Sequence, residues 1–140
     1  MSTNQGARGG DETQEPTNSS DMNDNTFENL EVWQDAIELA VRVYELFREC
    51  RDFGFRSQIQ NAAVSISNNI AEGYERDSNQ EFIRFPLIAK GSCGEVRSQS
   101  CIARRVGLLG EDDADRLIRD AKRLSKRMTR FIAVRREKFA

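Results

Sequence analysis

The sequence predicts an all-α fold, an antiparallel up-down-up-down four-helix bundle, and three observations support this prediction. Four segments carry apolar residues at the spacing of one helix face. The predicted connections between them are only about four residues long, which places successive helices side by side in opposite directions. The 140 residues include only two prolines and nine glycines, too few for a turn-rich β fold.

Residues 1–26 differ in composition from the rest and are predicted to be a disordered acidic tail, ahead of a four-helix bundle domain at 27–140. After the first residue, only Ala7 and Met22 in the tail are apolar, and five acidic residues against one basic residue give a net charge of −4. Such a segment cannot bury enough apolar surface to offset its ordering entropy. It also lacks the apolar stretch of a secretory signal, so a cytoplasmic location is expected.

The first predicted helix, residues 30–50, has more apolar surface than one buried face needs. Its first apolar stripe consists of Leu30, Trp33, Ile37, Ala40, Val41, Tyr44 and Phe47, and its second of Val32, Leu39, Val43 and Leu46. Together they exceed the apolar arc of roughly 100° that a surface helix requires. Because a small bundle cannot surround one of its own helices, we expect a second copy of the chain to cover the excess, which predicts a homo-oligomer.

The second predicted helix, residues 53–73, is rich in small side chains that let helices approach closely. Asn69 falls on its apolar face and has two interpretations. It is either a buried amide bonded to a backbone group or a neighbouring helix, or a polar group that lines a groove or channel.

A capping box at 78–81 predicts that the third helix begins at Asn79. Pro86 removes one backbone hydrogen bond and is expected to kink this helix. Gly91 and Gly94 weaken the same region, yet the apolar stripe resumes in phase after them.

The fourth helix is predicted to begin near Glu111, after Gly107 ends the third helix. Three acidic residues at 111–113 suit the positive end of its dipole. Opposite its apolar stripe, within an arc of about 100°, lies a set of basic residues that we call the basic strip. The basic strip consists of Arg116, Arg119, Arg123, Lys126, Arg127 and Arg130.

The basic strip has two main interpretations. In the first, it contacts phosphates of RNA or DNA, and the protein is an oligomeric nucleic-acid or ribonucleoprotein accessory factor. In the second, it is a solvated face of an oligomeric protein-interaction scaffold with no nucleic-acid role. Only Phe131 and Phe139 are aromatic nearby, and Phe131 belongs to the apolar stripe, so backbone contacts of low specificity are expected rather than base stacking. Membrane binding is not expected, because the bundle needs the apolar face of this helix.

The composition indicates that the protein is not an enzyme. Without histidine, the chain lacks the usual nucleophile–base pairs and the Glu-x-x-His motif of di-metal bundles. No glycine-rich phosphate-binding motif is present. We therefore expect no catalytic residue, no cofactor and no metal. Cys50, Cys93 and Cys101 are interpreted as reduced thiols, with a redox role as the alternative.

Three motifs in the middle of the chain carry a family resemblance. They are Ala62-Ala63-Val64-Ser65-Ile66, then Asn69-Ile70-Ala71-Glu72-Gly73, then Glu81-Phe82-Ile83-Arg84-Phe85. With them, residues 28–135 resemble the four-helix bundle proteins of the 23S rRNA intervening-sequence family. These are cytosolic bacterial proteins, and a related branch comprises accessory proteins of diversity-generating retroelements.

The resemblance implies a ring-shaped homo-oligomer, specifically a homopentamer, as in that related branch. It also implies partners of two kinds: RNA or DNA, and a reverse transcriptase or another protein. The sequence departs from the family pattern at Gln60 and Asn61, where arginines are common, and this weakens a nucleic-acid role for the second helix.

Overall fold

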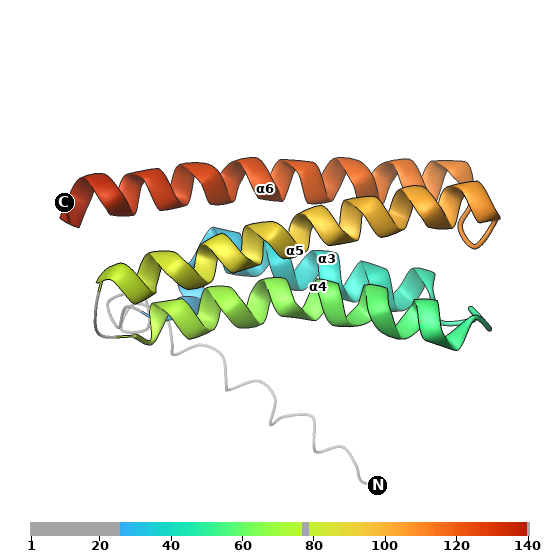
Figure 1. Ribbon diagram of the computed structural model, residues 1–140, viewed down its shortest axis with the longest axis horizontal. Helices are drawn as coiled ribbons and strands as arrows, with labels where there is room; N and C mark the ends of the chain where they lie inside the picture. Colours follow the sequence, from blue (N-terminus) through green and yellow to red (C-terminus); the bar gives the residue numbers. More distant parts are fainter. Residues whose placement is uncertain (1–25, 77–78, 140) are drawn as a thin grey trace, which may run out of the picture.

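The computed structural model describes residues 26–76 and 79–139, and within these ranges the chain is all-helical without any strand. A short 3-10 helix precedes four α-helices: η1 (Phe27–Asn29), α3 (Glu31–Leu46), α4 (Phe53–Tyr74), α5 (Asn79–Val106) and α6 (Glu111–Phe139). Figure 1 shows the four long helices side by side along the long axis of the molecule. The prediction of four helices is therefore confirmed. The acidic tail, apart from its last residue, and the start of the capping box lie outside the described residues.

The helix α3 ends at Leu46, about one turn before the predicted end at Cys50. Phe47 leaves the helical conformation, with φ −102° and ψ 11°, and its side chain is fully buried. Arg56 of α4 then donates from Nη1 to the carbonyl oxygens of Arg48 and Cys50, at 3.2 and 3.3 Å. The predicted end was wrong: beyond Leu46 the backbone forms a turn, in which the Cys50 amide donates to the carbonyl oxygen of Phe47 at 3.1 Å, and Arg56 pairs two carbonyl groups that follow the helix, a tertiary contact that local periodicity cannot show.

The turn between α5 and α6 is a Schellman motif, as the glycine at 107 predicted. Gly107 has a φ of +83°, a conformation that favours glycine. Its amide donates to the carbonyl oxygen of Arg104 at 3.3 Å, and the Leu108 amide donates to that of Ala103 at 2.8 Å. These bonds pair carbonyl groups that the end of α5 would otherwise leave unpaired.

The core lies along the axis between the four helices. The helix α5 packs against α4 and α6, and α3 contacts the same two helices. The approach of α4 to α5 is very close at Gly73, where an added Cβ would lie 2.9 Å from Pro86 Cδ. Pro86 is fully buried, and α5 is continuous through it. The main buried side chains of the core are Val32, Leu39, Val43, Phe47, Ile59, Ile66, Ile70, Val96, Leu117, Leu124 and Met128.

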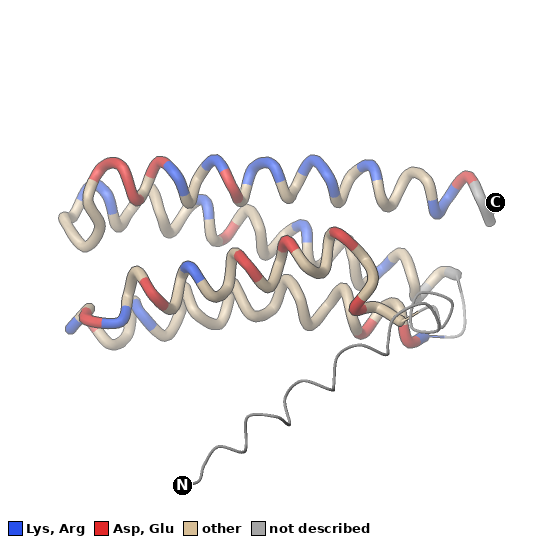
Figure 2. The backbone as a smooth tube through the Cα atoms, turned by 180° about the vertical axis from the view of Figure 1, so that it is seen from behind, with Lys and Arg blue, Asp and Glu red and all other residues tan. Residues whose placement is uncertain are grey.

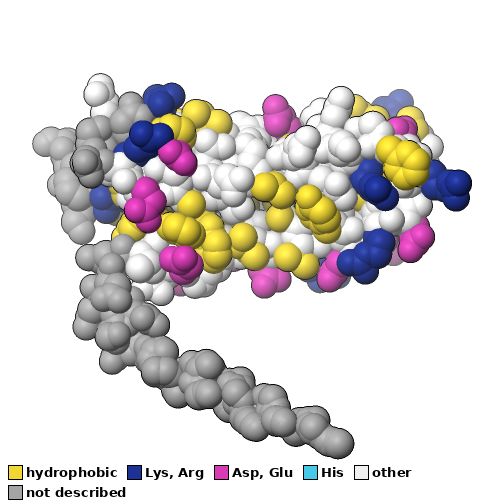
Figure 3. Space-filling model, turned by 90° about the horizontal axis from the view of Figure 1, so that it is seen from below, with side chains coloured by type: hydrophobic (Ala, Val, Ile, Leu, Met, Phe, Trp, Pro, Cys, Tyr) yellow, Lys and Arg dark blue, Asp and Glu magenta, His cyan; other side chains and the backbone are white. Residues whose placement is uncertain are grey.

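The helix α3 buries only part of its wide apolar surface. Trp33 and Ile37 are half-buried, while Val41 and Tyr44 are 49% and 45% exposed. We call these four residues, which follow one another at helical spacing, the outer stripe. Figure 3 views the molecule from below and shows hydrophobic side chains spread along the side of the bundle seen in that view. The chain alone therefore leaves apolar surface uncovered, as the two stripes of the sequence predicted.

Candidate nucleic-acid interface

The basic strip lies on the outer side of α6. Leu117, Ala121, Leu124 and Met128 of this helix are buried in the core, so the opposite side faces solvent. Five of the six predicted residues are exposed, and only Arg127 is half-buried. Figure 2 shows basic positions repeated along α6 and acidic positions along the neighbouring α3.

Arg127 connects α6 to α3 rather than facing solvent freely. Its Nη2 lies 2.6 Å from Glu31 Oε1, and its Nη1 donates to Asp35. Its charge is therefore compensated by two carboxylates from the start of α3. Sequence spacing placed Arg127 on the same arc as the other cations, but it could not show which acids of α3 would meet it.

Arg123 is also paired, although it remains largely exposed. Its Nη2 lies 3.1 Å from Asp120 Oδ1, one turn earlier on α6. Asp120 in turn lies 3.6 Å from Nε of Arg42 on α3. This pair is a surface salt bridge, so it reduces the local positive charge without fixing the Arg123 side chain strongly.

Four cations of the basic strip have no ion-pair partner among the described residues. They are Arg116, Arg119, Lys126 and Arg130. The first and the last of them are 14 positions apart along α6, which is about 21 Å at the helical rise. We call them the unpaired cations. A row of this length can face several consecutive phosphates of one nucleic-acid strand.

The C-terminal part of α6 has more aromatic neighbours than the sequence suggested, because other helices contribute Phe82 and Tyr74. The rings of Phe82 and Phe131 are stacked, with their centroids 5.9 Å apart. The ring centroids of Tyr74 and Phe82 are 5.3 Å apart. The guanidinium of Arg135 lies 3.9 Å from the centroid of Phe82. Phe82 lies near the start of α5, far from Phe131 in the sequence. The packing of α5 against α6 brings the two rings together.

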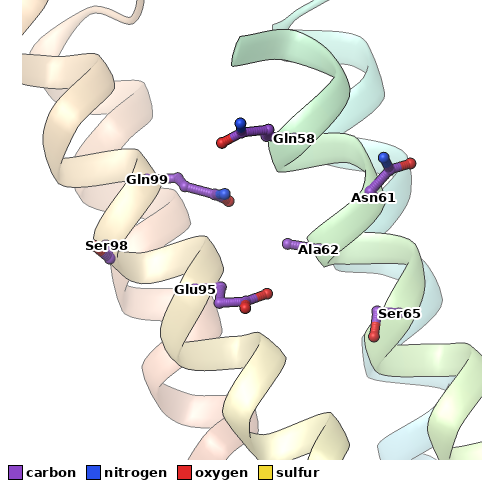
Figure 4. A pocket seen from close by; sticks show the side chains of 7 residues that line it. All are labelled: Gln58, Asn61, Ala62, Ser65, Glu95, Ser98 and Gln99. Atoms are coloured by element: carbon purple, nitrogen blue, oxygen red, sulfur yellow. The ribbon is translucent and has the colours of Figure 1, made fainter. Parts of the chain in front are cut away.

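A polar groove with a volume of about 430 Å³ lies between α4 and α5. Its lining residues are Gln58, Asn61, Ala62, Ser65, Glu95, Ser98 and Gln99. Figure 4 shows Glu95 and Gln99 of α5 pointing towards α4. The only ionisable side chain in this lining is a carboxylate, so the groove does not suit a phosphate. Asn61, at a position where the resemblance would place an arginine, leaves it without a cation.

Asn69 is a structural amide beside this groove. Its Nδ2 donates to the carbonyl oxygen of Ser65 at 2.8 Å and to Ser65 Oγ at 2.9 Å. The same hydroxyl lies 2.9 Å from Ser92 Oγ on α5. The bond to a backbone carbonyl agrees with the first interpretation, although Asn69 is half-buried rather than buried.

The described residues offer little for metal or thiol chemistry. Among them, no three cysteine or acidic side chains lie together in a way that could hold a metal ion. Cys50 and Cys101 are half-buried free thiols, and Cys93 is buried. Burial raises the pKa of Cys93 to about 12, although Arg97 and Lys90 partly oppose that shift. No described helix is long and apolar enough to cross a membrane.

Comparisons with known proteins agree with the fold. A family model described as 23S rRNA-intervening sequence protein matches residues 28–130. A crystal structure of a protein with unknown function, from the S23 ribosomal protein family of Bacteroides thetaiotaomicron, is similar with a TM-score of 0.68. The two sequences are 24% identical, and the similarity covers 72% of this chain and 97% of that one, which shows a shared fold. No curated protein matches the chain.

Proposed function

The chain belongs to the 23S rRNA-intervening sequence protein family, and we propose that it is a non-enzymatic nucleic-acid or ribonucleoprotein accessory factor of the cytoplasm. It binds the phosphate backbone through the basic strip on α6. The observation that carries the proposal is the row of four unpaired cations, about 21 Å long. The family description, which refers to 23S rRNA, is compatible with an RNA ligand.

The unpaired cations suit phosphates better than they suit bases. Phosphate contacts release condensed counterions, and this release supplies most of the affinity of sequence-independent binding. Such contacts position a protein on nucleic acid without conveying sequence information. Arg123 can join the row, since its exposed pair with Asp120 is weak and a phosphate can compete for it. Arg127 contributes less, because two carboxylates of α3 already hold it.

We further propose that copies of the chain associate through the outer stripe into a ring-shaped homo-oligomer, a pentamer by resemblance, of antiparallel up-down-up-down bundles. The exposure of Val41 and Tyr44 supports the association. Arg127 pairs with Glu31 while Arg42 pairs with Asp120, so residue numbers fall along α6 as they rise along α3. That order supports antiparallel packing. A ring would repeat the basic strip in every subunit, and weak contacts would then add up.

The second candidate function is an oligomeric protein-interaction scaffold without a nucleic-acid role. The same outer stripe favours it, because an uncovered apolar face also suits a different protein, such as the reverse transcriptase of the related branch. In that case the basic strip only keeps the protein soluble.

The salt dependence of binding separates the two functions. Four phosphate contacts per bound subunit predict a slope of log affinity against log salt of about −3.6 on duplex DNA. The double variant Arg119→Gln/Lys126→Gln should reduce that slope by about 1.8. The matched control, Arg48→Gln/Arg51→Gln, removes two exposed charges around the end of α3 and should leave the slope unchanged. Equal slopes for the double variant and the control would favour the scaffold.

A further inference from the structure

A hollow of about 310 Å³ lies where the start of α3 meets the C-terminal part of α6. Its apolar walls come from Leu30, Val32, Phe131 and Val134. Phe131 belongs to the apolar stripe of α6, yet it is only half-buried, and Val134 is 51% exposed. This volume is at the small end of the range for ligand pockets, about 300–1,000 Å³.

The rim of the hollow is continuous with the basic strip. Arg130, one of the unpaired cations, lines the hollow together with Arg127 and Glu31. The Glu31 carboxylate lies 2.6 Å from Arg127 Nη2, and Arg127 also pairs with Asp35, so these three side chains together carry a net charge of −1 and Arg130 supplies the opposing positive charge of the rim. A ligand that fills both features therefore combines a small apolar group with a chain of negative charges.

We propose that this hollow takes an unstacked base of single-stranded nucleic acid, while the unpaired cations hold the phosphates on its 5′ or 3′ side. This inference rests on the function proposed above and specifies its substrate class. Bases of a single strand or loop can leave their stack and rest on aromatic or arginine side chains, whereas the bases of a duplex stay paired. Phe131 and Arg130, one residue of each kind, both line the hollow. Sequence spacing predicted no stacking, because it assigned Phe131 to the core alone.

The test compares a 12-nucleotide single-stranded RNA with a duplex of the same length, using the full chain. Val134→Ser and Phe131→Leu should each lower the affinity for the single strand by about fivefold, from the loss of apolar contact and stacking. Affinity for the duplex and the salt slope for either ligand should stay unchanged. Val106→Ser is the matched control, since Val106 is an exposed valine on α5, 64% exposed and outside the hollow.

Two outcomes would overturn the inference. In the first, both hollow variants keep the wild-type ratio of single-strand to duplex affinity. In the second, Val134→Ser changes the particle mass in light scattering and leaves that ratio intact, which would make the hollow a contact between proteins. The function proposed above fails separately, when Arg119→Gln/Lys126→Gln leaves the salt slope unchanged. Phe131 also contacts Phe82, so circular dichroism must first show that Phe131→Leu is folded, and Val134→Ser carries the test where it is not.

Discussion

Replacing Gly73 by alanine should destabilise the protein, although alanine is the better helix former. Gly73 is buried in α4 where that helix touches α5. An added Cβ would lie 2.9 Å from Phe85 Cβ and from Pro86 Cδ, and 3.1 Å from the carbonyl oxygen of Phe82. None of these atoms is the end of a flexible side chain. The two helices would therefore have to move apart.

The magnitude follows from two opposing terms. Alanine gains about 1 kcal/mol over glycine within a helix. Overpacking a close contact costs about 1–3 kcal/mol. The expected result for Gly73→Ala is a net loss of about 1 kcal/mol in the free energy of unfolding. Gly91→Ala is the matched control, because nothing lies within 4 Å of its added Cβ, and this variant should gain about 1 kcal/mol.

Urea unfolding, followed by far-ultraviolet circular dichroism at one protein concentration, measures this difference of about 2 kcal/mol between the two variants. Equal concentrations matter because association would add to the apparent stability. A Gly73→Ala variant as stable as Gly91→Ala would refute the close contact between α4 and α5.

Four further predictions concern surfaces and thiols. Val41→Glu places a charge in the outer stripe and should prevent association. Light scattering should then find a mass near 16.0 kDa for this variant and a larger mass for the parent chain. Equal masses would count against the ring. Deleting residues 1–26 should raise affinity for RNA, because the net charge of −4 competes with phosphates for the basic strip, and an unchanged affinity in gel shifts would remove that role. Iodoacetamide at pH 8 should modify Cys50 and Cys101 before Cys93, because the thiolate is the reactive form. Mass spectrometry that finds Cys93 modified first would contradict its burial. The pKa of Cys93 is raised in the folded chain, so the unfolded chain loses the thiol proton at a lower pH than the folded chain does. The free energy of unfolding should therefore fall as the pH rises from 9.0 to about 12.

Local signals were sufficient to predict most of the fold. The four apolar stripes and the glycine at 107 depend on residues within one or two turns of each other, so a single sequence reveals them. The end of α3 was missed because Arg56, from the next helix, pairs two carbonyl groups in the connection that follows α3, a contact that periodicity does not reveal. The exposed part of α3 was predictable too, since its apolar arc is wider than one face.

The basic strip shows which features of the site the sequence alone can predict and which it cannot. Helical periodicity alone determined that six cations share one arc of α6. Only the tertiary structure decided that Arg127 meets Glu31 and Asp35, and that Phe131 and Val134 frame a hollow with the start of α3. The reason is physical: spacing along one helix sets which side chains share a face, whereas partners on another helix depend on how the helices turn and pack against each other.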